Sequence, residues 1–311
     1  MKIALDPYMH RHVSLVELPK LAAELGYEYI ELSPRADFLD WWVRPRAYPE
    51  RIREFKAALR DNGVRIASLL PMYRWASPNE DERLAAVRYW KEAIQIAVEM
   101  EVDTMNSEFG RGSSPEAQSC LCNGGTVEHS EAAFWKSMDD LVPVFEREKI
   151  NLHLEPHPED WVETLHPAVD MIRMIDSPQV KFLYCAPHTY YFGDDMAAMI
   201  QDAAPVLAHV HVADTMNHRA SSGLRYIVNP PGSRARVHQH LNLGQGEIDW
   251  DLFFGSLHAV GFDGIVTSCV FAWEDRAEAS SRFMRKEIQR YVDKYWGSTA
   301  ARTRSATSAA A

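Results

Sequence analysis

The feature that most limits what this chain can fold into is a strict alternation of short apolar segments with longer amphipathic ones. The short segments predict eight buried strands, and the amphipathic patterns between them predict helices. The strands are expected at residues 2–6, 29–33, 65–70, 103–108, 151–155, 180–185, 208–214 and 264–270. Alternation of this kind with about eight strands favours a single (β/α)8 barrel, a TIM barrel of the α/β class, over a doubly wound sheet.

The length of 311 residues permits one large domain or two ordinary ones. No change in composition marks a second domain, so we predict one barrel over residues 1–296. The final segment, 297–311, is rich in Ser, Thr and Ala, and we expect it to be disordered. Two loops are longer than a bare barrel needs: 111–128 after the fourth strand and 215–249 after the seventh. Long loops of this kind tend to be lids or docking surfaces.

Composition limits the partners of the chain. Its apolar content of 46% and charged content of 25% are typical of a soluble globular protein. The net charge of -11 argues against nucleic acid as a partner, because such binding needs clustered Lys and Arg. No apolar run is long enough to span a membrane, and residues 1–6 predict a strand rather than a signal peptide, so we expect a cytoplasmic protein. Its four cysteines do not indicate a disulfide framework.

The segment 151–158 carries a clear functional signal. Its leucines alternate with His153, Glu155 and His157, so the three polar side chains share one face of a strand that a proline then ends. A carboxylate and an imidazole are thereby placed together at a strand end. A buried histidine beside a hydrogen-bonded carboxylate would explain this strand equally well, so other strands must decide.

Polar residues lie at or near the C-terminal ends of nearly all the predicted strands. Because the C-terminal ends of barrel strands converge, such residues can meet although they are far apart in sequence. They are Asp6, Glu31, Asn106, Glu108, Glu155, His157, Cys185, His188, His211, Asp214 and Cys269. His209 and His211 share a face, and we assign the outer one, His211, as a ligand. A lone histidine is usually a core or surface residue, but several with a glutamate at one barrel mouth favour a divalent metal.

These motifs resemble those of the xylose-isomerase-like barrels, a superfamily of sugar isomerases, ketose 3-epimerases, inosose dehydratases and type IV apurinic-site endonucleases. The resemblance covers nearly the whole chain. It rests on Glu155, Cys185-Ala-Pro-His188, His211-Val-Ala-Asp214 and the run from His240 to Gly246. The epimerases imply a divalent ion held by Glu155 and His211, but Cys185 and Cys269 stand where two further carboxylates are expected. A pair of carboxylate bases flanking the substrate carbon is therefore not available.

The endonuclease branch implies additional imidazole ligands, which correspond to His188, His238 and His240. We therefore expect Glu155 and His211 to hold the ion, with His188, His240 or His238 completing the set. Cysteine ligation would favour zinc, but cysteines in strands are mostly small buried apolar residues. We favour Mn2+ on these grounds, with Zn2+ or Mg2+ as alternatives.

Several runs also look like the larger, α subunit of bacterial C-glycoside deglycosidases: residues 71–78, 105–109, 184–192 and 270–273. This resemblance implies a lyase that cleaves the carbon–carbon bond between a 3-oxo sugar and an aromatic aglycone. It also implies a divalent metal, a small β-sandwich β subunit as partner and a higher hetero-oligomer. Aromatic and basic residues that follow strand ends suit such a substrate. Those assigned to substrate binding are Tyr73, Arg74, Trp75, Tyr190 and Trp273.

For this reaction His157 is the candidate base that removes the C2 proton, because an imidazole titrates near neutral pH. Glu108 is the candidate acid; it can also bind sugar hydroxyls, or pair with Arg74 or Arg111. Arg74 can balance the charge of a phenolate.

Two other function classes remain open. An isomerase, epimerase or dehydratase of a free sugar or keto-inositol would share the metal and the proton abstraction, but it needs a second base. A non-catalytic scaffold subunit is permitted by the missing carboxylates. A metal-dependent phosphodiesterase acting on DNA would share the histidines, and the acidic charge argues against it.

Overall fold

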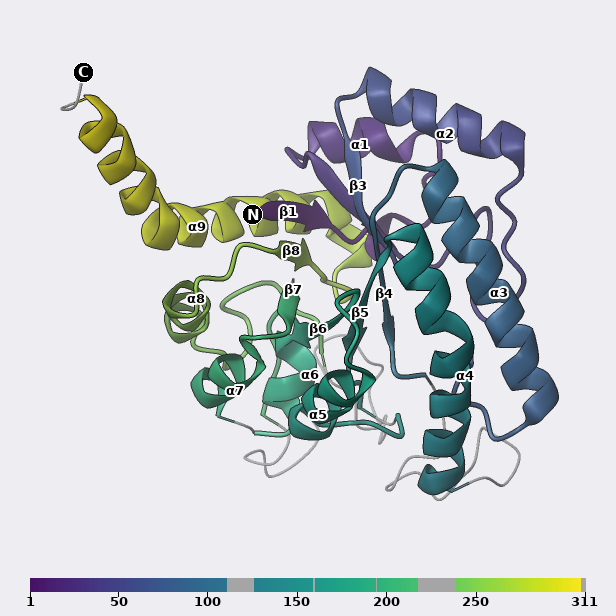
Figure 1. Cartoon of the computed structure of the whole chain (residues 1–311). Coiled ribbons are helices and arrows are strands. Elements are labelled where there is room, and N and C mark those ends of the chain that lie inside the picture. The colour runs from purple at the N-terminus through teal and green to yellow at the C-terminus, as the bar shows by residue number, and fades with distance from the viewer. Residues whose placement is uncertain (111–125, 159, 194, 218–238, 309–311) are drawn as a thin grey trace, which may run out of the picture.

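The computed structural model describes residues 1–110, 126–158, 160–193, 195–217 and 239–308, with side chains described to residue 297. Eight parallel strands close into a barrel in sequence order, and helices cover its outside (Figure 1). The predicted TIM barrel is therefore confirmed. The strands are β1 (Lys2–Leu5), β2 (Tyr29–Leu32), β3 (Arg65–Leu69), β4 (Thr104–Glu108), β5 (Asn151–Glu155), β6 (Val180–Cys185), β7 (Leu207–Val212) and β8 (Ile265–Ser268).

Helices connect the strands, and local sequence signals set where several of them begin. α2 begins at a proline, whose fixed φ suits the first helical position, and the side chain of Asn79 caps α3 by accepting a hydrogen bond from the Glu82 amide at 3.1 Å. The helices are η1 (Tyr8–His10), α1 (Leu18–Glu24), α2 (Pro49–Asp61), α3 (Glu80–Glu99), α4 (Val127–Glu148), α5 (Leu165–Ile175), α6 (Ala186–Tyr191), α7 (Met196–Ala203), α8 (Trp250–Ala259), η2 (Glu274–Arg276) and α9 (Ala277–Ser308).

The strands divide their side chains between two environments. Leu152 and Leu154 of β5 belong to the main hydrophobic core, which packs the sheet against the helices. Ala4, Ala67 and Ile265 form a separate apolar cluster. Because β1 and β3 are not neighbours in the sheet, their side chains meet only across the inside of the barrel. The polar side chains that alternate with the β5 leucines therefore point toward the barrel axis and its open end.

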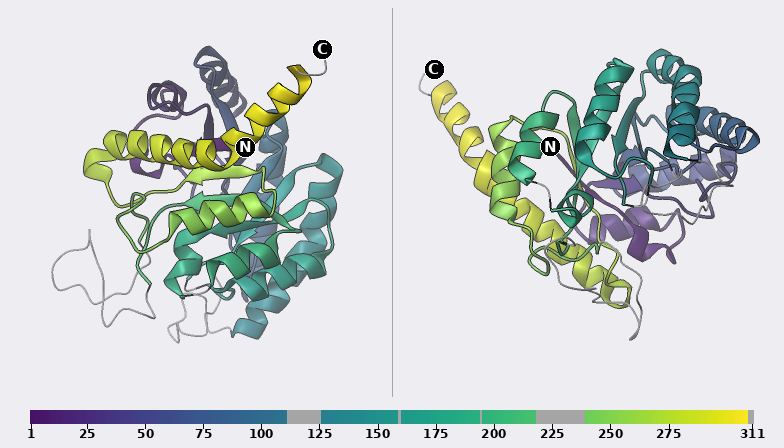
Figure 2. Two further views of the ribbon diagram at one scale, coloured as in Figure 1. Left: turned by 90° about the vertical axis from the view of Figure 1, so that its left-hand side faces the viewer. Right: turned by 90° about the horizontal axis from the view of Figure 1, so that it is seen from below.

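Helix α9 extends beyond the barrel at its C-terminal end (Figure 2). Its bounds, Ala277–Ser308, include most of the segment 297–311 for which the sequence predicts disorder, so disorder there stays a prediction. Large parts of the two long loops, 111–125 and 218–238, lie outside the described residues. Their function as lids or docking surfaces also stays a prediction.

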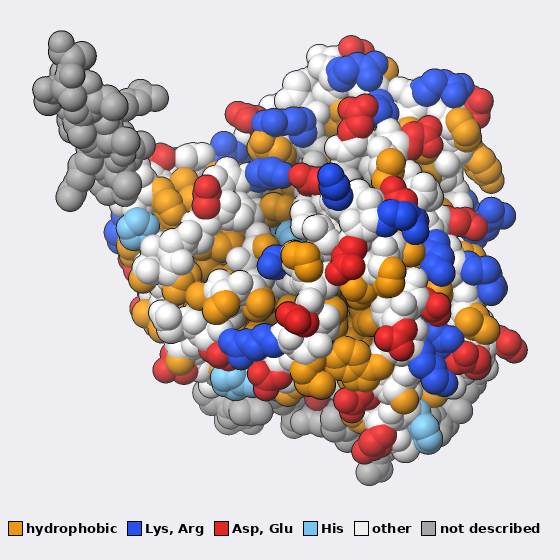
Figure 3. Space-filling view, in the orientation of Figure 1, with side chains coloured by type: hydrophobic (Ala, Val, Ile, Leu, Met, Phe, Trp, Pro, Cys, Tyr) orange, Lys and Arg blue, Asp and Glu red, His pale blue; other side chains and the backbone are white. Residues whose placement is uncertain are grey.

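Basic and acidic side chains are interspersed over the face formed by α2, α3 and α4 (Figure 3). None of the helices in the described part of the chain is both long enough and apolar enough to cross a membrane.

Candidate active site

Three strands bring Glu155, Cys185 and His211 together at the C-terminal end of the barrel. Glu155 ends β5, Cys185 ends β6, and His211 of β7 is the register partner of Cys185. One possible ligand atom from each residue lies within 4.8 Å of the other two, and all three side chains are buried. The closed barrel therefore places Glu155 and His211, the first two predicted metal ligands, side by side.

The carboxylate of Glu155 faces two imidazoles. Its Oε2 atom lies 3.3 Å from Nδ1 of His211 and 3.4 Å from Nδ1 of His188. These distances suit ion pairs, but Glu155 Oε2 accepts no hydrogen bond of good geometry from the described residues. Burial raises the pKa of Glu155, but the neighbouring His211 and His188 outweigh it and hold the pKa well below its usual range. The carboxylate is therefore ionised at neutral pH.

A second cluster, formed by Cys185, His188 and His240, adjoins the first. Nδ1 of His188 donates to the Pro156 carbonyl at 3.1 Å, and Nδ1 of His240 donates to the Cys269 carbonyl at 2.7 Å. The Nε2 atoms of the two rings then face each other at 3.3 Å. Two imidazole lone pairs at this distance repel unless a proton or a cation lies between them.

The pKa values of His188 and His240 are shifted in opposite directions. Burial lowers the pKa of His188, but nearby Cys185 and Glu155 outweigh it and raise the pKa to about 10. Burial and the charge of His188 hold the pKa of His240 well below its usual range. A single proton shared between the two rings therefore resides on His188.

This donor set fits a divalent cation. A buried carboxylate oxygen without a hydrogen bond, a thiol and facing imidazole nitrogens are the donor types that zinc and manganese sites use. Of the predicted ligands, the structure brings Glu155, His188, His211 and His240 into two adjoining clusters. His238 lies outside the described residues.

Glu31 also lies at this site, although the sequence assigned it no role. Its side chain is fully buried, with Oε1 at 2.9 Å from Nε2 of His211 and Oε2 at 3.1 Å from Nε2 of His209. The hydroxyls of Ser68 and Thr267 donate to Oε2 at 3.0 and 3.2 Å. His209 is fully buried inside the barrel and thus helps to hold Glu31 beside His211.

The pKa of Glu31 follows from this surrounding. Burial raises it, but His211 and His209 outweigh burial and hold the pKa far below its usual range. The sequence signal for this site was a glutamate within the apolar strand Tyr29–Leu32. A buried carboxylate is stable only when it is paired with another polar or charged group. Which partner it meets depends on barrel closure.

The predicted base and acid lie beside these clusters. His157 Nε2 is 3.6 Å from Glu108 Oε1, and the His157 ring meets the His188 ring edge to face at a centroid distance of 4.5 Å. Nδ1 of His157 donates to the Pro158 carbonyl at 2.6 Å, so Nε2 carries the lone pair in the neutral ring. Asp160, a buried carboxylate that the sequence did not single out, forms a cluster with Glu108 and His157. The catalytic roles of these residues stay predictions.

Tyr73 and Trp75, expected to bind substrate, lie in the hydrophobic core. Trp75 is fully buried and stacks on Trp90 of α3 at a centroid distance of 4.3 Å. Tyr73 is 2% exposed and contacts the same Trp90 ring edge to face. Because both rings are covered by the helix layer, we correct their assignment from substrate binding to core packing. A large aromatic residue just after a strand can line the rim of the barrel mouth or pack in the hydrophobic core. The local sequence does not distinguish these two positions.

The other predicted substrate residues lie near the surface of the described chain. Arg74 pairs with Glu82 at 2.8 Å. The Tyr190 hydroxyl donates to the Glu247 carbonyl at 2.8 Å, and the Trp273 indole N–H donates to the Gln245 side chain at 2.8 Å. Their contact with a substrate stays a prediction.

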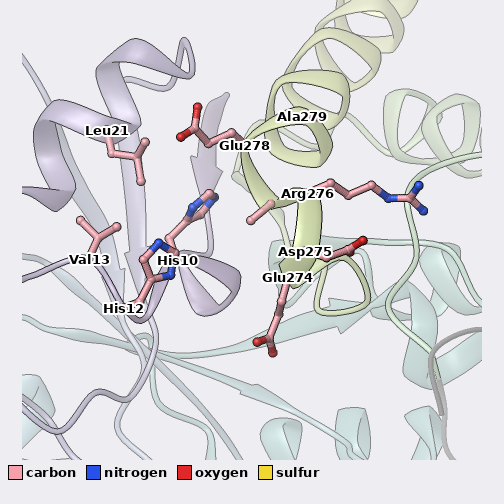
Figure 4. Close-up of a pocket in the computed structure, with 10 residues that line it drawn as sticks. His10, His12, Val13, Leu21, Glu274, Asp275, Arg276, Glu278 and Ala279 are labelled. Atoms are coloured by element: carbon pink, nitrogen blue, oxygen red, sulfur yellow. The ribbon is translucent and has the colours of Figure 1, made fainter. Parts of the chain in front are cut away.

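A separate pocket of about 320 Å³ lies between η1 and the start of α9 (Figure 4). It shares no residue with the clusters described above. Its lining residues are His10, His12, Val13, Leu21 and the segment from Glu274 to Ala279.

Solved structures with the same fold support this architecture. An IOLI protein with a bound zinc atom is 17% identical, with a TM-score of 0.72 over 95% of this chain and 99% of that one. The 3-keto-D-glucoside 4-epimerase YcjR from E. coli is 19% identical, with a TM-score of 0.70 over 92% and 98%. The probable 3-DHS dehydratase AsbF from Bacillus anthracis is 18% identical, with a TM-score of 0.69 over 93% and 99%. At these identities the likeness shows the fold alone.

None of the curated proteins matches the chain significantly. The family model described as "Xylose isomerase-like TIM barrel" matches residues 19–287, which is most of the sequence. Together with the closed barrel of eight strands, this match shows that the chain belongs to the xylose isomerase-like TIM barrel family.

Proposed function

We propose that this chain is a metal-dependent lyase that cleaves 3-oxo C-glycosides by removing the C2 proton of the sugar and releasing an aromatic aglycone. The observation that carries the proposal is the position of His157. An imidazole base of defined tautomer lies against His188, which belongs to a cluster that fits a divalent cation. A base beside such a cluster suits proton removal next to a ketone.

The residues that would hold the ion are Glu155, His211 and His188, with His240 beside them. A bound divalent ion supplies Lewis-acid stabilisation of negative charge on the ketone oxygen. One of the solved structures with this fold contains zinc, which supports a divalent ion here. The preference for Mn2+ assumed that the cysteines are small buried apolar residues. The proximity of Cys185 to Glu155 and His211 argues against part of that assumption.

His157 takes the C2 proton on Nε2. Its Nδ1 hydrogen bond to the Pro158 carbonyl leaves Nε2 as the basic nitrogen, and the adjacent Glu108 stabilises the imidazolium that forms. A positioned base of this kind contributes about 10²- to 10⁴-fold in rate. Loss of the proton leaves negative charge shared between C2 and the ketone oxygen of the sugar.

The bond between C1 and the aglycone carbon then breaks, and its electron pair moves to the aglycone carbon. That carbon takes a proton from Glu108, which as a carboxylate first receives the proton of the His157 imidazolium 3.6 Å away. Asp160 lies in the same cluster and can exchange a proton with the pair. The products are an unsaturated 3-oxo sugar and the free aglycone, and no redox change is needed.

The proposal includes contacts beyond the reacting atoms. Tyr190, Arg74 and Trp273 would contact the sugar or the aglycone. A small β-sandwich subunit would complete the enzyme in a hetero-oligomer located in the cytoplasm.

A second candidate is an epimerase or dehydratase acting on a keto sugar. It is favoured by the likeness to a 3-keto-D-glucoside 4-epimerase and a probable dehydratase, which share the fold. Both reaction types can begin with proton removal next to a ketone, so they would use the same base. A non-catalytic scaffold subunit is the remaining alternative.

The test is incubation of the metal-loaded chain, with and without a β-sandwich partner subunit, with a 3-oxo C-glycoside in deuterated water. We expect free aglycone by liquid chromatography and deuterium at C2 in recovered substrate. Deuterium exchange without aglycone release would favour the epimerase or dehydratase. If neither deuterium exchange nor aglycone release occurs with the partner present, this result would contradict the lyase and the epimerase or dehydratase proposals and favour the scaffold subunit.

His157→Ala should reduce both signals by about 10²- to 10⁴-fold. The matched control is His166→Ala, which removes a surface imidazole paired with Asp202 and should leave both signals unchanged. Equal effects of the two substitutions would contradict the role of His157.

A further inference from the structure

Cys185 occupies a position that the proposed chemistry does not yet use. It is the last residue of β6, and its side chain is 1% exposed. It belongs to two ligand clusters, one with Glu155 and His211 and one with His188 and His240. Within each cluster the ligand atoms lie within 4.8 Å of one another. The Cys185 sulfur is therefore within ligand reach of a carboxylate and three imidazoles.

These surroundings differ from those of an ordinary buried cysteine. A buried thiol usually serves as a small apolar side chain packed against other apolar groups. The atoms near Cys185 are instead a carboxylate oxygen and ring nitrogens, which are costly to bury in apolar surroundings. The donor atoms of each cluster are of the types that bind a divalent cation, and a thiolate of Cys185 would add one more such donor to either cluster.

Cys269 provides a comparison in the same barrel. It follows the end of β8 and is 2% exposed. Its S–H group donates to Asp6 Oδ2 at 3.7 Å. Among the described residues Cys269 belongs to none of the ligand clusters. Cys269 also neighbours His211, but its S–H group has the Asp6 carboxylate as an acceptor, and this hydrogen bond distinguishes it from Cys185.

We propose that Cys185 is a metal ligand and that its thiolate makes the centre select a zinc-class ion over Mn2+ or Mg2+. The inference rests on the proposed metal-dependent function and specifies the ion that this function uses. On binding, the Cys185 S–H bond breaks, a sulfur–metal bond forms, and the proton leaves to solvent. Soft thiolate ligands favour zinc, whereas a set of carboxylate and imidazole alone accommodates manganese. The proposal therefore replaces the sequence-based preference for manganese.

The test is a metal titration of the full chain carrying Cys120→Ser and Cys122→Ser, which removes the two thiols outside the described residues. Cobalt(II) is the probe because a thiolate ligand produces a sulfur-to-cobalt charge-transfer band in the near ultraviolet. We expect this band at stoichiometric cobalt. Zn2+ should abolish it by displacing cobalt, and Mn2+ in large excess should not.

Variants assign the band to one sulfur. Cys185→Ala should remove it and lower zinc affinity by more than the roughly 10- to 100-fold that loss of an outer hydrogen-bond partner costs. Cys269→Ala, the matched control, should retain the band. Cys185→Asp replaces the thiolate by a carboxylate and should shift the preference toward Mn2+. Circular dichroism and thermal unfolding confirm that each variant is folded, and the wild-type preference for zinc tests the inference without any variant.

Failure of this inference differs from failure of the proposed function. Cobalt bound without the sulfur band, a band that survives Cys185→Ala, or tighter binding of Mn2+ than Zn2+ would overturn the ligand role of Cys185 and leave a metal enzyme. If the chain binds none of cobalt, zinc and manganese, both the ligand role of Cys185 and the proposed metal-dependent function are overturned.

Discussion

Single residues at the barrel mouth act mainly through buried charge. Glu155 Oε2 lies 3.3 Å from Nδ1 of His211, and Glu31 Oε1 lies 2.9 Å from its Nε2. Burial lowers the pKa of His211, but the two carboxylates outweigh it and raise the pKa well above its usual range. An imidazole held from both sides keeps one ring orientation, which is what a metal ligand requires.

Glu31→Gln should therefore destabilise the metal-free protein by about 3–5 kcal/mol, because it leaves two buried imidazoles without their shared carboxylate. Urea denaturation of the chelator-treated protein measures this change. Glu50→Gln, which removes an exposed carboxylate paired with Arg53, is the control and should have a negligible effect. A change as small at Glu31 as at Glu50 would show that the buried carboxylate does not hold the histidines.

At the scale of elements, aromatic packing joins the loop after β3 to the helices outside it. Trp75 stacks on Trp90 of α3, meets Phe134 of α4 edge to face at 5.9 Å, and donates its indole N–H to the Phe109 carbonyl at 2.8 Å. Gly110 allows this approach, because a Cβ there would lie 2.6 Å from the Trp75 ring and its φ is +95°. The loop is thereby fixed between α3 and α4.

Trp75→Ala should lower the free energy of unfolding by about 3–5 kcal/mol, as expected for removal of a large buried aromatic side chain. Chemical denaturation provides the measurement. Trp75→Phe should lose less, since it keeps an aromatic ring in the stack. If the alanine variant instead keeps its stability and only its KM rises, the assignment of Trp75 to the core is wrong.

Buried hydrogen bonds connect helix α9 to residues near the start of the chain. Nε2 of His10 in η1 lies 2.9 Å from the Ser281 hydroxyl, and the Tyr27 hydroxyl donates to the Ser281 carbonyl at 2.9 Å. Burial and the neighbouring His12 lower the pKa of His10, and the opposing effect of Glu278 is smaller. This contact therefore depends on a neutral imidazole.

A histidine whose folded-state pKa is lowered costs stability when it is protonated. The contribution of His10 should be fully present above its unfolded pKa of 6.5 and should be lost as pH falls from 6.5 through the lower folded value. We expect the stability of the wild type relative to His10→Asn to decrease over that range. Urea denaturation of both proteins between neutral and mildly acidic pH measures this difference, and a constant difference would contradict the role of His10.

At the scale of the whole molecule, barrel closure couples metal binding to folding. The ligand clusters combine residues from β5, β6 and β7 with His188 from α6 and His240 from the segment before α8, so they exist only in the closed structure. An ion that binds the folded chain and not the unfolded one stabilises it by mass action.

Zinc at about 100 times its Kd should therefore raise the free energy of unfolding by about 2.7 kcal/mol, and a chelator should reverse the gain. Thermal or urea unfolding with and without zinc measures it. Unchanged stability at saturating zinc would indicate that the ion does not bind these clusters in the folded state.

Local sequence patterns predicted much of the fold and several of the residues that the structure brings together at the candidate site. Glu155, His188, His211 and His240 were predicted because each lies at or just beyond a strand end or in a histidine motif, and the structure does bring them together. Glu31 had no predicted role because its partners belong to β7, far along the chain. Trp75 was misplaced because an aromatic residue after a strand end can face either a helix or the barrel mouth.

The order of the strands, and which face of β5 and β7 is polar, followed from the sequence, because spacing between neighbouring residues sets the direction of side chains along one element. The tertiary structure alone decided that Cys185 lies within reach of both ligand clusters, and that Glu31 and Glu155 hold His211 from its two sides. Those contacts cross the barrel or join separate strands. Their distances depend on strand register and on closure of the sheet, which no local pattern encodes.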